Sequence, residues 1–230
     1  MLLRIEQDED ATSPRVDFDN LGHMVCFHNR YNLGDEQDEI SDKDYNGWEE
    51  MAAGIKSLYP GCLILPLYLY DHSGITIKTT PFGCRWDSGQ VGFIYMTRET
   101  MLAEAPGNPK YVTKKVRDWA EECLKAEVSE YDQYLTGDVW GYIVEDDEGE
   151  DLESCWGFFG EEYCRTEGKA VLHSLMEGYW KEFGNIPVDA EDNITEDFKH
   201  FEAGTDRMEI WHWFDENYSK GLAALQGVAT

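Results

Sequence analysis

The sequence predicts an α+β fold, in which an antiparallel sheet is packed by helices and the surface is acidic. Three observations support this prediction. Aromatic and β-branched residues gather in short runs between residues 61 and 97, a long amphipathic segment follows at 109–136, and the formal net charge is −28. With 230 residues and a hydrophobic content of 42%, the chain can bury a core as one large domain or two small ones.

Residues 1–60 are expected to form an acidic N-terminal region that packs on the core. Arg15–Asn20 alternates weakly, and His23–His28 is typical of a short strand. An acidic loop follows at residues 31–47, with turn residues at both ends. Trp48–Leu58 has the apolar spacing of a helix and ends before a Pro-Gly pair.

Residues 61–165 are expected to form a central α+β core. Strands are predicted over Leu63–Tyr70, Ile75–Thr80 and Val91–Thr97, and the first two are joined by a stretch of turn composition, DHSG. Residues 61–110 hold four acids and four bases, so this stretch is neutral in a strongly acidic chain. Neutrality fits a buried sheet, because charge is costly to bury.

The clearest helix runs from Pro109 to Thr136, with Gly137 as its C-terminal stop. Its apolar residues share one broad arc at about 100° per residue, and its acids mostly lie opposite. Glu127 is the exception, because it falls in the middle of the apolar arc. A carboxylate buried there needs a partner, and Arg85 and His72 are the candidates.

A second hairpin is predicted from Val139–Val144 and Leu152–Phe159. Its tip, EDDEGED, carries six acids. A helix over Glu161–Phe183 follows, and residues 166–230 are expected to form an acidic helical C-terminal region. The three regions are expected to make one compact unit.

The cysteines and the acid–base residues match no motif of a metal site or an active site. Six cysteines, at positions 26, 62, 84, 123, 155 and 164, form no CxxC pair and fit no zinc spacing. We expect reduced core thiols, with a disulfide framework as the alternative. Asp71-His72-Ser73 contains the residue types of a catalytic triad, but consecutive side chains point in different directions and cannot relay a proton. The sequence therefore predicts no catalytic residue, no metal and no cofactor, and a protein that is not an enzyme.

Negative charge is spread unevenly along the chain. Residues 1–60 carry −9, residues 111–170 carry −11 and residues 171–230 carry −8. A field of this sign repels nucleic acids and anionic membranes and attracts basic proteins. A well-solvated surface of the kind that salt adaptation produces is the simpler alternative.

Acidic side chains in regular elements can mimic a nucleic-acid backbone. Carboxylates four residues apart on a helix lie about 5–6 Å apart, and those on alternate strand residues about 6.6 Å apart, close to the spacing of successive phosphates. The predicted partner-binding residues are Asp118 and Glu122 on the helix, Glu145, Asp146, Asp147, Glu148, Glu150 and Asp151 at the hairpin tip, and Asp35, Glu36, Asp38 and Glu39 in the loop.

Four blocks of sequence, LPLYLYDHSGI, WDSGQVGFIY, YDQYLTGDVWGY and SCWGFFG, resemble a set of uncharacterised proteins from bacterial phages and mobile elements. The resemblance covers about residues 61–165. It implies an accessory gene, among which inhibitors of host defence are common, and it assigns no catalytic residue.

Charge and resemblance together predict a counter-defence protein of anti-CRISPR or antirestriction type in the cytoplasm of the host cell. Its expected partner is a basic nucleic-acid-binding protein or complex of the host, such as a CRISPR effector or a restriction enzyme. We expect no direct binding to nucleic acid or to membranes. The alternative is a small-ligand-binding domain, or an enzyme, that uses the aromatic sheet and Glu127. Glu127 would then be an acid–base group of raised pKa; the structural interpretation makes it a member of an ion pair or places it at a partly exposed position.

Overall fold

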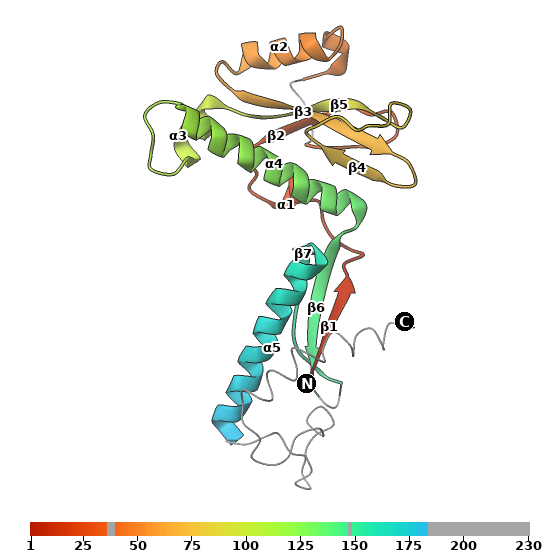
Figure 1. The fold of residues 1–230 in the computed structure, drawn as a ribbon, viewed down its shortest axis with the longest axis vertical. Coiled ribbons are helices and arrows are strands. Elements are labelled where there is room, and N and C mark those ends of the chain that lie inside the picture. Colours follow the sequence, from red (N-terminus) through yellow and green to blue (C-terminus); the bar gives the residue numbers. More distant parts are fainter. Residues whose placement is uncertain (36–39, 147–148, 184–230) are drawn as a thin grey trace. The chain divides into compact units, whose positions relative to one another are not determined.

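A four-stranded sheet and a three-stranded sheet organise the chain. Figure 1 shows a computed structural model, which describes residues 1–35, 40–146 and 149–183. Helices combined with these sheets give the α+β fold that the sequence predicts. The described residues divide into two compact units, which are treated separately below.

The four-stranded sheet has the strand order β2-β5-β3-β4, and all its pairs are antiparallel. Its strands are β2 (His23–Cys26), β3 (Leu63–Asp71), β4 (Ile75–Lys78) and β5 (Ser88–Met96). The sequence predicted each of them within a few residues, because alternating or continuous apolar runs ended by Gly, Pro and Asp are local signals.

One irregularity decides which way the side chains of β5 point. Leu67 pairs with Gly92 and Tyr68 pairs with Gln90, so Val91 bulges out of the ladder. Val91 and Ile94 therefore face one side of the sheet and Phe93 the other.

Gly92 of β5 lies against the backbone of β2. A Cβ atom on this residue would lie 1.9 Å from the carbonyl oxygen of Val25. Only glycine fits at this position, because any larger side chain would clash with the backbone of β2.

The long helix α4 (Lys114–Thr136) covers one face of this sheet (Figure 1). The Thr113 side chain accepts a hydrogen bond from the Val116 N–H and caps the helix. α4 therefore begins at Lys114, five residues after the predicted start at Pro109. Gly137 ends it in the left-handed conformation, as predicted. The core on this face joins residues of α4 to residues of the sheet: Val116, Ala120, Leu124, Val128 and Tyr131 to Met24, Leu67, Leu69, Ile77, Val91, Ile94 and Met96.

The shorter helix α2 (Trp48–Leu58) covers the opposite face (Figure 1). Met51 and Ile55 of α2 are buried against Val25, Phe93 and Tyr95 of the sheet. The sequence predicted both ends of this helix.

Two short helices were not predicted. Residues 15–20, which alternate weakly in sequence, contain most of α1 (Pro14–Asp17), where Ser13 accepts a hydrogen bond from the Arg15 N–H and a proline starts the helix. The helix α3 (Arg98–Glu104) is capped by Thr97, whose side chain accepts from the Thr100 N–H. Both caps are visible in the sequence as Ser or Thr before a helical turn.

The three-stranded sheet has the order β1-β6-β7, with β1 (Leu2–Gln7), β6 (Val139–Glu145) and β7 (Asp151–Phe159). The second predicted hairpin is thus confirmed, and so is the helix α5 (Glu161–Phe183). β1 was missed, although Leu3 and Ile5 alternate with polar residues and are both buried.

The two units differ from the three predicted regions. One unit, hereafter the sandwich unit, consists of Glu6–Gly141 and Trp156–Tyr163 and contains the four-stranded sheet. The other begins with Met1–Ile5 and Tyr142–Cys155 and continues from Cys164. Strands from the first 60 residues are paired with strands from the middle of the chain, and the second unit resumes at Cys164, close to the predicted boundary at residue 165.

Candidate functional site

A buried guanidinium lies at the edge of the α4 face of the sandwich unit. The side chain of Arg15 is 1% exposed. Its Nε and Nη2 donate to the two carboxylate oxygens of Asp35 over 2.8 and 3.1 Å, and its Nη1 donates to Glu127 over 2.8 Å. Asn20 and the carbonyl of Gly22 accept two further hydrogen bonds, at 2.7 and 2.6 Å. Arg15 is therefore fully hydrogen-bonded.

Charge attraction keeps this guanidinium ionised. Burial by itself lowers the pKa of Arg15, but hydrogen bonds and attraction to Asp35 and Glu127 outweigh burial and raise its pKa above the ordinary value. One cation and two carboxylates leave the cluster with a net charge of about −1.

Glu127 has the partner that the helix pattern requires, but the partner is Arg15 and not Arg85 or His72. Its other oxygen accepts from the N–H groups of Leu21 and Gly22 at 2.9 and 3.0 Å. The side chain is 12% exposed. A carboxylate with its oxygens occupied in this way ties α4 to the segment before β2, which favours the structural interpretation over the acid–base one.

The start of the acidic loop is fixed to the sheet. Asp35 accepts from the Met24 N–H at 2.7 Å, and its own N–H donates to the Met24 carbonyl at 2.9 Å. Gly34 forms a bridge with Val25 and donates to the Tyr131 hydroxyl of α4 at 3.0 Å. Asp35 was predicted to bind a partner protein, and the structure places it in these internal contacts.

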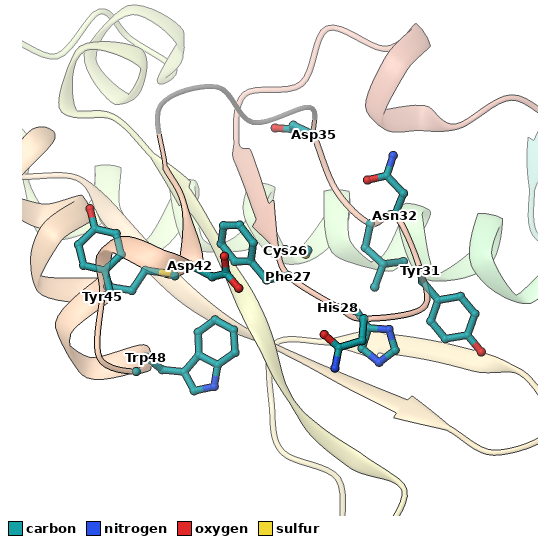
Figure 2. A pocket seen from close by; sticks show the side chains of 13 residues that line it. Cys26, Phe27, His28, Tyr31, Asn32, Asp35, Asp42, Tyr45 and Trp48 are labelled. Carbon is teal, nitrogen blue, oxygen red and sulfur yellow. The ribbon is translucent and has the colours of Figure 1, made fainter.

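A pocket of about 490 Å³ opens beside this fixed segment, on the α2 side of the sandwich unit (Figure 2). One wall is the chain after β2, and the other runs from the 3₁₀ turn η1 (Asp42–Asp44) into the first turn of α2. Four aromatic residues line it together with a histidine and two aspartates: Phe27, Tyr31, Tyr45 and Trp48, His28, Asp35 and Asp42.

Packing on α2 holds the aromatic rings in place. Trp48 meets Phe93 of the sheet edge-to-face, with ring centroids 6.1 Å apart. Tyr45 lies over the backbone of α2 at Gly54, where an added Cβ atom would be 2.4 Å from the Tyr45 ring. His28 stacks on Tyr31 at 5.0 Å. Trp48 and Tyr45 are therefore preorganised by contacts outside the pocket, and His28 and Tyr31 by their contact with each other.

A second pocket, of about 380 Å³, adjoins His28 on the far side. Here Arg30 forms an ion pair with Asp71 and lies 5.3 Å from the centre of the Tyr31 ring. Trp86, at the rim, is 95% exposed.

Cys26 is a poor nucleophile despite its place in the larger pocket. Burial, helped by the nearby charge of Asp35, raises the pKa of its thiol to about 12. The thiol therefore stays protonated at neutral pH, and the lining offers no activated cysteine there.

The predicted partner-binding acids lie in different settings. Asp118 and Glu122 of α4 form ion pairs with Lys114 and Lys125 of the same helix, at 2.6 and 3.1 Å. Glu145 pairs with Arg4 at 2.6 Å and is 12% exposed. The helix therefore does not present an uninterrupted row of carboxylates.

At the hairpin tip, Asp146 accepts from the Glu150 N–H at 2.9 Å and closes the turn. Glu150 and Asp151 are exposed. The remaining predicted residues, Glu36, Asp38, Glu39, Asp147 and Glu148, lie outside the described residues.

An acidic segment that the sequence prediction passed over lies at residues 6–19. Its only base is Arg15, which is buried. The segment holds six acids: Glu6, Asp8, Glu9, Asp10, Asp17 and Asp19. The composition alone could have pointed to this segment, but only the structure shows that the segment's own base is buried and not on its surface.

Comparisons with known proteins give no relative. No protein-family model, no curated protein and no solved structure matches this chain. Among the helices in the described part of the chain, none is long and apolar enough to cross a lipid bilayer.

Proposed function

We propose that this protein is a counter-defence protein that binds and inhibits a basic, nucleic-acid-binding complex of the host, such as a CRISPR effector or a restriction enzyme. The observation that supports this most is the acidic segment 6–19, whose only cation is withdrawn into the Arg15 cluster. Kinship with phage and mobile-element proteins, which the four sequence blocks predict, is part of the same proposal. In this proposal the protein acts by occupying a surface and not by catalysis.

Electrostatics favours a basic partner. A net charge of −28 on 230 residues gives a field that speeds association with positive surfaces and opposes contact with nucleic acid itself. A groove that normally binds phosphates offers such a surface.

Ion pairs within α4 argue against this helix as the main contact surface. Acids that already have lysine partners on the same helix add little attraction, because the pair is close to neutral at a distance. Glu9 and Asp10, in contrast, are exposed in a segment without an exposed base. We therefore place the N-terminal segment ahead of α4, with the hairpin tip as a second contact.

An infection assay tests this function. A host that carries one defined CRISPR or restriction system is challenged with a phage that the system targets, with and without expression of the protein. We expect plaque formation to rise when the protein is present. The double variant Glu9→Gln, Asp10→Asn should weaken the effect, whereas the matched pair Glu99→Gln, Glu104→Gln, on exposed positions of α3, should not. If no tested system is inhibited, the proposal fails.

A second candidate function, a small-ligand-binding domain, is favoured by one observation, the preorganised aromatic pocket on the α2 side. Its volume of about 490 Å³ lies within the range of ligand sites. Salt separates the two functions, because groove occupation by many charges weakens steeply with ionic strength, whereas a small ligand held by ring contacts and at most one ion pair responds weakly.

A further inference from the structure

We propose that the pocket on the α2 side of the sandwich unit is a guanidinium site, which takes an arginine side chain of the basic partner. The identity of the occupant rests on the proposed function, whereas the affinity of the pocket for guanidinium does not. Three observations support the proposal: the negative charge of the pocket lining, its aromatic rings, and the contacts of Arg30 with Tyr31 and Asp71 in the neighbouring pocket.

The charge of the lining selects for a cation. Among the described residues that line the pocket, none is lysine or arginine and two are aspartate. The Asp42 carboxylate is exposed and forms no hydrogen bond or ion pair with any residue that the structure describes. Asp35 belongs to the Arg15 cluster, in which two carboxylates face one cation. A ligand in the pocket therefore meets net negative charge.

Aromatic rings supply the second half of the site. In Figure 2, Asp42 lies with Phe27 and Trp48 at one end of the pocket, and His28 and Tyr31 lie at the other. Ring faces attract cations, and tryptophan does so most strongly. A guanidinium suits this combination better than an ammonium, because its plane stacks on a ring while its N–H groups make two parallel bonds to one carboxylate.

The same chain already holds one guanidinium in this way. Arg30 lies over the Tyr31 ring and forms an ion pair with Asp71. Tyr31 also lines the α2-side pocket. The neighbouring site thus shows that a ring and a carboxylate at this end of the sheet can hold an arginine.

An anionic ligand fits less well. The pocket does reach the start of α2, where Gly47 caps the helix without a side-chain hydrogen bond, and helix N-termini attract anions. Glu49 and Glu50 already occupy the first turn, however, and Asp42 lies at the pocket. Three carboxylates there outweigh the partial positive charge of one helix end, which is about half a unit.

Arginine amide is the probe that tests the site, and citrulline amide, which has nearly the same shape and the same α-ammonium group but no guanidinium charge, is its control. Chemical-shift changes in the ¹⁵N-labelled full chain report binding, with the Trp48 indole as the local signal. We expect arginine amide to bind with a Kd on the order of millimolar, since it makes one ion pair and a few ring contacts. Lysine amide should bind less tightly. Equal binding of citrulline amide would overturn the proposal.

Asp42→Asn tests the role of the carboxylate, and Asp44→Asn, on the same turn but outside the pocket lining, is its matched control. We expect Asp42→Asn to weaken arginine amide binding about threefold to fivefold at low salt, as for an exposed ion pair, and Asp44→Asn to leave it unchanged. Equal effects of both variants would show attraction to overall charge and overturn the site. If the wild-type protein inhibits host defence but does not bind arginine amide, only this inference is wrong. If it binds arginine amide but inhibits no defence system, only the proposed function is wrong.

Discussion

The two faces of the four-stranded sheet are covered in different ways. On one face α4 has 23 residues, about 35 Å of helix, and its Glu127 is paired with the buried Arg15. On the other face α2 has 11 residues, about 17 Å, and a pocket opens next to its first turn. Strand β3 alone is about 30 Å long.

The different lengths of α4 and α2 give the two faces of the sheet different roles, one in stability and the other in binding. A helix as long as the strands it covers can bury an apolar arc from end to end. Two carboxylates of α4 turn toward other elements of the unit: Glu127 is paired with Arg15, and Asp132 accepts from the Thr76 hydroxyl and the Ile77 N–H of β4. A helix of half that length leaves part of the sheet edge to loop residues, whose aromatic and acidic side chains remain accessible. We therefore expect substitutions on the α4 face to change stability and those around the pocket to change binding.

The largest effect is expected from Arg15→Met. This change leaves two carboxylates, Asp35 and Glu127, without their cation, and breaking a buried ion pair costs about 3–5 kcal/mol. Urea denaturation of the variant measures the loss in the free energy of unfolding. Arg30→Met is the control, because Arg30 is 65% exposed and its pair should contribute less than about 1 kcal/mol. Similar losses for both variants would contradict the distinction between the paired interior and the surface.

Gly92→Ala should have the next largest effect. The new methyl group would overlap the carbonyl oxygen of Val25, so β2 and β5 must move apart, at a cost of about 1–3 kcal/mol or more. Gly89→Ala, in the same strand, is the matched control because nothing lies within 4 Å of its added Cβ atom. Thermal unfolding of the two variants checks the prediction, and an equally stable Gly92→Ala protein would show that the sheet adjusts easily here.

Gly54→Ala should produce two opposing effects on the α2 face. Alanine favours the helix by up to about 1 kcal/mol, but its methyl group displaces the Tyr45 ring. We expect a net change in stability within about 1 kcal/mol, with weaker binding of arginine amide. In a Tyr45→Leu background the same substitution should stabilise the protein, because the ring is gone. If it destabilises there as well, the helix and not the ring is the site of conflict.

The smallest effect is expected from Asp118→Asn on α4. Its ion pair with Lys114 is solvent-exposed, so the melting temperature should not change measurably. Inhibition of host defence should also stay the same if compensated acids do not contribute to the contact surface. A clear loss of inhibition with an unchanged melting temperature would return α4 to the proposed interface.

The sequence by itself determined the regular elements that have strong local patterns. The period of α4 predicted its buried arc, its end at Gly137 and the need of Glu127 for a partner. Both ends of α2 and the hairpin of β3 and β4 followed from neighbouring residues in the same way. Such signals are available in sequence because they depend on residues only a few positions apart.

The tertiary structure alone decided which distant residues meet. Glu127 pairs with Arg15, 112 positions earlier in the chain, although Arg85 and His72 were nearer in sequence. Likewise, the chain path sets the pocket between the end of β2 and the start of α2, and it brings Glu145 to Arg4. Charge and periodicity are properties of a segment, but pairing and concavity arise from the packing of segments, and no single segment encodes them.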